Sequence, residues 1–142
     1  EGIRISKVQL SAALSVQHTP EAMVALKAFA EPVYLHQTKA RTRDGTIHSW
    51  PDLPVALDEL GVHPDIEEIR VHFHVPLFFE GTGIIESTAG TLTPAFFAEL
   101  RKGATSHLEI ETYTFDVLPP EVHPGDMVKS IAREFQWVRE HI

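Results

Sequence analysis

Cysteine is absent from this chain of 142 residues. Its absence excludes disulfides, thiolate metal ligands and cysteine nucleophiles together. The chain also lacks an apolar run long enough to span a membrane, and its N-terminus has no signal-peptide pattern. We therefore expect a cytoplasmic protein without membrane insertion.

Positive charge is scarce as well. Lys and Arg together number 12 against 20 Asp and Glu, which gives a formal net charge of −8. This balance disfavours nucleic-acid binding and favours a small-molecule partner. With 43% hydrophobic and 23% charged residues, the composition is typical of one globular unit with a substantial core. The chain begins with Glu1 instead of Met, which indicates a piece of a longer polypeptide.

A glycine-rich phosphate loop is also missing. The stretch GTGIIESTAG, residues 81–90, has glycines but neither the order nor the context of a nucleotide-binding fingerprint. A doubly wound nucleotide-binding sheet thereby loses its main support. A complete barrel of eight strand–helix units takes about 250 residues. The chain is therefore expected to be either a small doubly wound sheet or part of a barrel.

Signals for strands and helices alternate along the chain. Apolar, β-branched and aromatic residues predict strands at 3–14, 33–40, 69–79 and 107–115. Capping residues, Thr-Pro starts and apolar stripes predict helices at 18–32, 51–61, 93–103 and 125–142. Strands that alternate with helices imply a mostly parallel sheet covered by helices, which is an α/β fold.

Polar side chains recur at alternate positions of these strands. His72 and His74 are two residues apart, so they share one side of their strand while Val71, Phe73 and Val75 face the other. The same alternation places further polar residues on an inward-facing side, namely Gln9, Ser11, Glu109 and Glu111. The strand at 33–40 is ambiguous, with Val33 and Leu35 on one side and Tyr34 and His36 on the other. Burying so many polar groups is costly unless they are hydrogen-bonded or bind a metal. Their convergence predicts a polar site.

Each of these residues also has a structural explanation. A single strand histidine is more often a hydrogen-bonded structural residue than a functional one. Glu109 and Glu111 could lie on a solvated edge of an antiparallel strand. A serine hydrolase built on Ser11 or Ser87 is disfavoured because the chain has no nucleophile-elbow motif.

Four runs of the sequence resemble a known family. They are IRISKVQLSAAL, EPVYLHQ, RVHFHVPLF and HLEIETYTFDVLP, and they resemble the C-terminal part of the EboE family of metabolite traffic proteins. The resemblance spans nearly the whole chain, with LEIETYTFDVLP its most specific piece. That family belongs to the xylose isomerase-like TIM barrels, alongside sugar phosphate isomerases and epimerases. The resemblance implies that residues 1–142 are the C-terminal portion of a (β/α)8 barrel whose upstream half lies outside this chain.

The resemblance also implies a divalent metal, held by carboxylates and a histidine of the late strands. Histidine and glutamate without cysteine suit Mn²⁺, Zn²⁺, Fe²⁺ or Mg²⁺. Glu111 corresponds to the carboxylate of the last strand, whereas Gln9 stands where the superfamily usually has histidine. His74 and Glu111 come late in their strands, near the mouth at which barrels collect active sites. We predict both as metal ligands and catalytic residues. The predicted substrate contacts are Gln9, His36, His72 and Glu109.

The expected function is therefore a metal-dependent sugar or sugar phosphate isomerase or epimerase, acting in the processing or traffic of a small polar metabolite. One alternative is a metabolite-binding or carrier protein that keeps the barrel without the chemistry. Another is a half-barrel interaction module that pairs with its missing half or with a second copy, because a partial barrel exposes apolar edges. The sequence leaves open whether 33–39 and 69–75 are barrel strands or an inserted pair.

Overall fold

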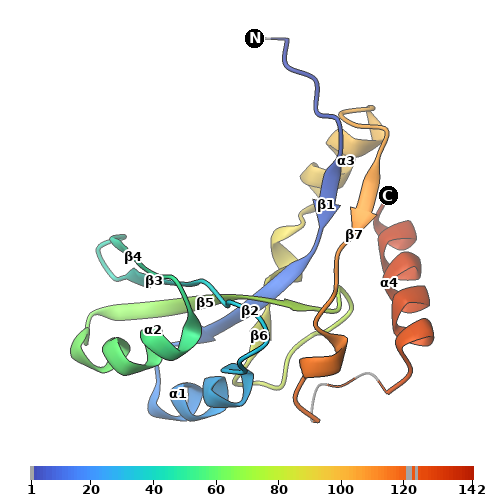
Figure 1. The fold of residues 1–142 in the computed structure, drawn as a ribbon. Coiled ribbons are helices and arrows are strands. Elements are labelled where there is room, and N and C mark those ends of the chain that lie inside the picture. The colour runs from blue at the N-terminus through green and yellow to red at the C-terminus, as the bar shows by residue number, and fades with distance from the viewer. Residues whose placement is uncertain (1, 121–122, 124) are drawn as a thin grey trace.

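The structure, a computed structural model, describes residues 2–120, 123 and 125–142. In these residues seven strands form two sheets, and four α-helices pack around them (Figure 1). No helix in the described ranges is long and apolar enough to cross a membrane.

The larger sheet has five strands in the order β4-β3-β5-β2-β6. Their bounds are Ala12–Gln17 for β2, Thr38–Thr42 for β3, Ile47–Trp50 for β4, Ile66–Val75 for β5 and Glu86–Ser87 for β6. Every neighbouring pair in this sheet is antiparallel. The tip between β3 and β4 is a turn at Asp44-Gly45, with Gly45 at a φ of 89°.

One face of this sheet forms the core. Alternate residues of β5, namely Ile69, Val71, Phe73 and Val75, are buried. The two short helices α1, Pro20–Leu26, and α2, Leu53–Glu59, cover this face and begin at the caps Thr19 and Asp52. The opposite face carries exposed polar residues, as is common for antiparallel sheets.

The smaller sheet is a parallel pair, β1, Val8–Leu10, and β7, Leu108–Ile110. The helix α3, Pro94–Arg101, precedes β7, and the helix α4, Met127–His141, follows it (Figure 1). Their predicted caps, Thr93 and Asp126, each accept a backbone N–H. The rings of Phe97 on α3 and Trp137 on α4 lie 6.0 Å apart, edge to face, and join the two helices.

The expectation of a mostly parallel sheet is wrong for the described residues, because only β1 and β7 pair in parallel. The helical connections join strands that run in the same direction, β2 to β3 through α1 and β4 to β5 through α2. These strands are not neighbours: β5 lies between β2 and β3, and β3 lies between β4 and β5, so each neighbouring pair is antiparallel. The strand predicted at 3–14 divides near Ser11, where the chain passes from one sheet to the other. The strand predicted at 33–40 begins only at Thr38.

The two sheets are neither closed nor curled. The C-terminal portion of a barrel therefore stays a prediction. The described topology does favour an insertion: β1, α3, β7 and α4 follow one another as strand, helix, strand and helix, and the antiparallel sheet stands between β1 and α3.

Candidate functional site

His72 and His74 lie on the same side of β5, as the alternation predicts. Their Nε2 atoms are 2.8 Å apart, and their ring centres are 4.8 Å apart. His74 is buried, with 4% of its surface exposed, whereas His72 is exposed to solvent. The pair therefore links the interior of the protein to its surface.

The proton positions of His74 follow from its partners. Its Nδ1 lies 2.6 Å from the carbonyl oxygen of Glu111, and a carbonyl only accepts, so we assign the proton of His74 to Nδ1. Burial lowers the pKa of His74, and the bond to the Glu111 carbonyl opposes that shift only in part. Neutral His74 then accepts a hydrogen bond at Nε2 from His72.

The second nitrogen of His72 faces the side chain of Gln37. Nδ1 of His72 lies 3.0 Å from Oε1 of Gln37. If Nδ1 donates to this oxygen, His72 carries two protons and a positive charge. If the amide turns over, its NH₂ group donates and His72 is neutral. The orientation of the Gln37 amide therefore decides whether Nδ1 of His72 donates or accepts this hydrogen bond.

Glu111 comes directly after β7 and contacts β1. Its carboxylate accepts a hydrogen bond from Nε2 of Gln9 at 2.8 Å, and its backbone N–H donates to the carbonyl of Leu10 at 3.1 Å. Glu111 thus joins the end of β7 to β1 and β5. Its carboxylate and its N–H bond to Gln9 and Leu10 on β1, and its carbonyl accepts a hydrogen bond from His74 on β5. This is the centre of the candidate site.

Two tyrosines border this centre. The ring of Tyr113 lies 4.7 Å from the ring of His74 and 5.2 Å from that of Tyr34. Partial burial raises the pKa of Tyr113, and the negative charge of Glu111 adds to the shift. Tyr113 is a site residue beyond those predicted from the sequence, although its position two residues after Glu111 is a signal for the same side of an extended segment.

Two predicted substrate contacts lie outside this cluster. His36 is fully buried, its Nε2 lies 2.7 Å from Oε1 of Glu31, and its ring lies against Phe73. Its contacts hold the segment before β3 onto β5, which is a structural role. Glu109 forms an exposed ion pair with Lys7. The structure therefore brings together Gln9, His72, His74 and Glu111, and leaves out His36 and Glu109.

A buried carboxylate on α4, that of Glu134, bonds to segments next to the site residues His74 and Glu111. Oε1 of Glu134 accepts hydrogen bonds from the backbone N–H of Leu77 at 3.0 Å and from the hydroxyl of Thr112 at 2.7 Å. Burial raises the pKa of Glu134. Thr114 donates its hydroxyl to the carbonyl of His74. These bonds tie α4, the end of β5 and the segment that carries Glu111 together (Figure 1).

The predicted metal ligands, His74 and Glu111, touch through a backbone carbonyl and not through the carboxylate. Within the residues that the structure describes, no group of three or more His, Asp and Glu side chains could hold a metal ion. The side chains present thus form an incomplete ligand set. A divalent metal at this site stays a prediction.

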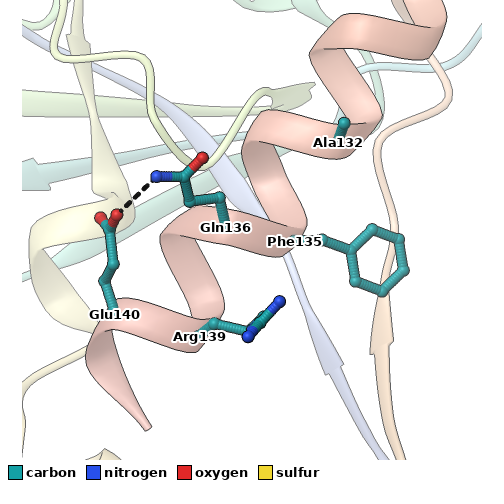
Figure 2. A pocket seen from close by; sticks show the side chains of 5 residues that line it. All are labelled: Ala132, Phe135, Gln136, Arg139 and Glu140. Atoms are coloured by element: carbon teal, nitrogen blue, oxygen red, sulfur yellow. Dashed lines mark hydrogen bonds between the residues drawn. The ribbon is translucent and has the colours of Figure 1, made fainter.

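A hollow of about 500 Å³ lies on the outer face of α4 (Figure 2). The lining residues drawn there all come from this one helix, and the hydrogen bond from Gln136 to Glu140, 2.9 Å long, joins neighbouring turns. Among the described residues no second element contributes a group to its lining, so this hollow is a weaker candidate than the centre around Glu111.

In comparisons with known proteins, no family model, no curated protein and no solved structure matches the chain.

Proposed function

We propose that this chain is the C-terminal part of a xylose isomerase-like (β/α)8 barrel that binds a small polar metabolite and moves a proton on it, as an isomerase or epimerase does. The observation that carries the proposal is the contact of Gln9 with Glu111, which bridges two parallel strands at the carboxyl end of β7. Functional groups of such barrels collect at that end of the strands.

The chemistry of the site supports proton transfer. The carboxylate of Glu111 is half-buried and has one neutral hydrogen-bond donor, Gln9, so it is available as a base. An isomerase needs a base that takes a proton from a carbon beside a carbonyl and returns it to the neighbouring carbon. An epimerase returns it to the other face of the same carbon.

Deuterium exchange tests this proposal. The protein is incubated in D₂O with a panel of aldoses, ketoses and other small hydroxy-carbonyl compounds, and mass spectrometry follows deuterium at carbon. We expect incorporation into at least one compound, and a loss of about 100-fold or more in Glu111→Gln. Glu109→Gln is the matched control, because Glu109 lies two residues earlier and forms an exposed ion pair. An equal loss of deuterium incorporation in both variants would show that Glu111 is not the base.

A binding or carrier protein on the same scaffold is the second candidate. Gln9 favours it, because its amide cannot exchange a proton as a histidine can. In the same experiment, a carrier would bind a member of the panel without any exchange. If no compound of the panel bound to the protein and none exchanged deuterium, both candidates would be contradicted.

A further inference from the structure

The open face of the larger sheet carries a hollow of about 440 Å³ beside His72. Its lining includes Lys39, Arg70, His72 and Gln37, together with Ala13 and Trp50, and no carboxylate lies among the described residues that form it. This concentration of donors and cations contrasts with the chain as a whole, whose formal net charge is −8.

The register of the sheet sets two of these cations against each other. Lys39 on β3 lies directly opposite Arg70 on β5. Like charges directly opposite each other on a sheet destabilise it. The nearest acid, Glu68, balances the charge of Arg70 only in part. Its carboxylate accepts a hydrogen bond from Nε of Arg70 at 2.7 Å, but it also accepts one from Arg41 at 3.0 Å.

Both cations keep unused donors that can reach a ligand. Lys39 donates to the hydroxyl of Ser49 at 2.9 Å, a neutral partner that leaves its charge unbalanced among the described residues. Arg70 bonds Glu68 through Nε, which leaves its two terminal amino groups for a ligand. A guanidinium suits an oxyanion because it can donate two parallel hydrogen bonds.

We propose that this hollow is a binding site for the oxyanionic group, phosphate or carboxylate, of a small metabolite. The anion accepts hydrogen bonds from Lys39 and Arg70 and relieves their mutual repulsion. His72 borders both this hollow and the pair with His74. The rest of a metabolite anchored here extends toward Glu111. That the ligand is a metabolite rests on the proposed function.

Binding of simple anions to the full chain tests the inference. Two-dimensional NMR follows the backbone amides during titrations with inorganic phosphate and with acetate at constant ionic strength. We expect saturable shifts confined to residues around Lys39, Arg70 and His72 with at least one of the anions, and the stronger of the two identifies the preferred group. Lys39→Gln and Arg70→Gln should each weaken binding by about 10-fold.

Two controls separate this inference from its alternatives. Lys102→Gln removes an exposed lysine at the C-terminal end of α3, where it pairs with Glu99. This variant should leave anion binding unchanged. Glu111→Gln should also leave it unchanged, so failure of the proposed chemistry does not remove the anion site. Absence of saturable shifts with both anions, or equal weakening in Lys102→Gln, would overturn the inference. Because Lys39 and Arg70 are exposed, all these variants should fold.

Discussion

Glu134→Ala should lower the free energy of unfolding by roughly 3 kcal/mol, because it leaves the Leu77 N–H and the Thr112 hydroxyl without their acceptor and opens a cavity. Glu134 is buried, with 1% of its surface exposed, and both bonds end on its Oε1 atom. Glu134→Gln keeps an oxygen at this position and should retain most of that stability at neutral pH. Denaturant unfolding of the variants measures both effects.

The stability contributed by Glu134 should also depend on pH in a defined direction. Its pKa in the folded protein is raised above the ordinary value of 4.5. Folding therefore favours the protonated carboxyl, whose contribution is fully present below pH 4.5 and is lost as the pH rises through the raised pKa. The stability of the wild type relative to Glu134→Gln should fall between acid and neutral pH.

Glu140 on the same helix supplies the control, since it is exposed and bonds only to Gln136 among the described residues. Glu140→Ala should change the free energy of unfolding by less than about 0.5 kcal/mol. If Glu134→Ala were equally mild, the buried bonds to Leu77 and Thr112 would not hold α4 in place.

His74→Ala should cost roughly 3 kcal/mol, since it removes a buried ring and leaves the carbonyl of Glu111 without its donor. His74→Asn can still donate near that carbonyl, so it should cost less. Burial lowers the pKa of His74 below the ordinary value of 6.5. The stability that neutral His74 contributes is therefore present above pH 6.5 and is lost as the pH falls below it.

The difference in unfolding free energy between the wild type and His74→Asn should accordingly shrink from pH 7.5 toward pH 5. The exposed His107 gives the comparison, and His107→Ala should leave stability nearly unchanged. A pH-independent difference for His74→Asn would mean that His74 accepts a proton inside the folded protein as readily as outside it.

Local features of the fold were predictable from the sequence, because they depend on neighbouring residues. The caps Thr19, Thr93 and Asp126 begin helices as expected. The alternation correctly places His72 and His74 on one side of β5, opposite the apolar residues Val71, Phe73 and Val75, although His74 is buried as well. Strand direction was not predictable in the same way: an apolar strand between helical segments fits a parallel sheet, and the antiparallel pairing of β5 with β2 and β3 depends on contacts distant in sequence.

The candidate site was predictable in its residue types but not in its connections. His74 reaches Glu111 through a backbone carbonyl, and any residue type supplies such a carbonyl, so no sequence pattern marks the contact. Glu134 was missed because one glutamate near an apolar helical stripe resembles an ordinary surface residue. His36 was predicted as a contact because alternation gives the side of a strand, and it actually precedes β3 and bonds Glu31.

Neutral His74, with its proton on Nδ1, joins β5 to Glu111. The most direct test is ¹⁵N NMR of the histidine ring nitrogens at neutral pH, with His74 identified by comparison with His74→Asn. We predict a protonated Nδ1 and an unprotonated Nε2 for His74, persisting to a pH below 6.5. A proton on Nε2 with Nδ1 bare would contradict it, because the carbonyl of Glu111 could not then accept a hydrogen bond from this ring.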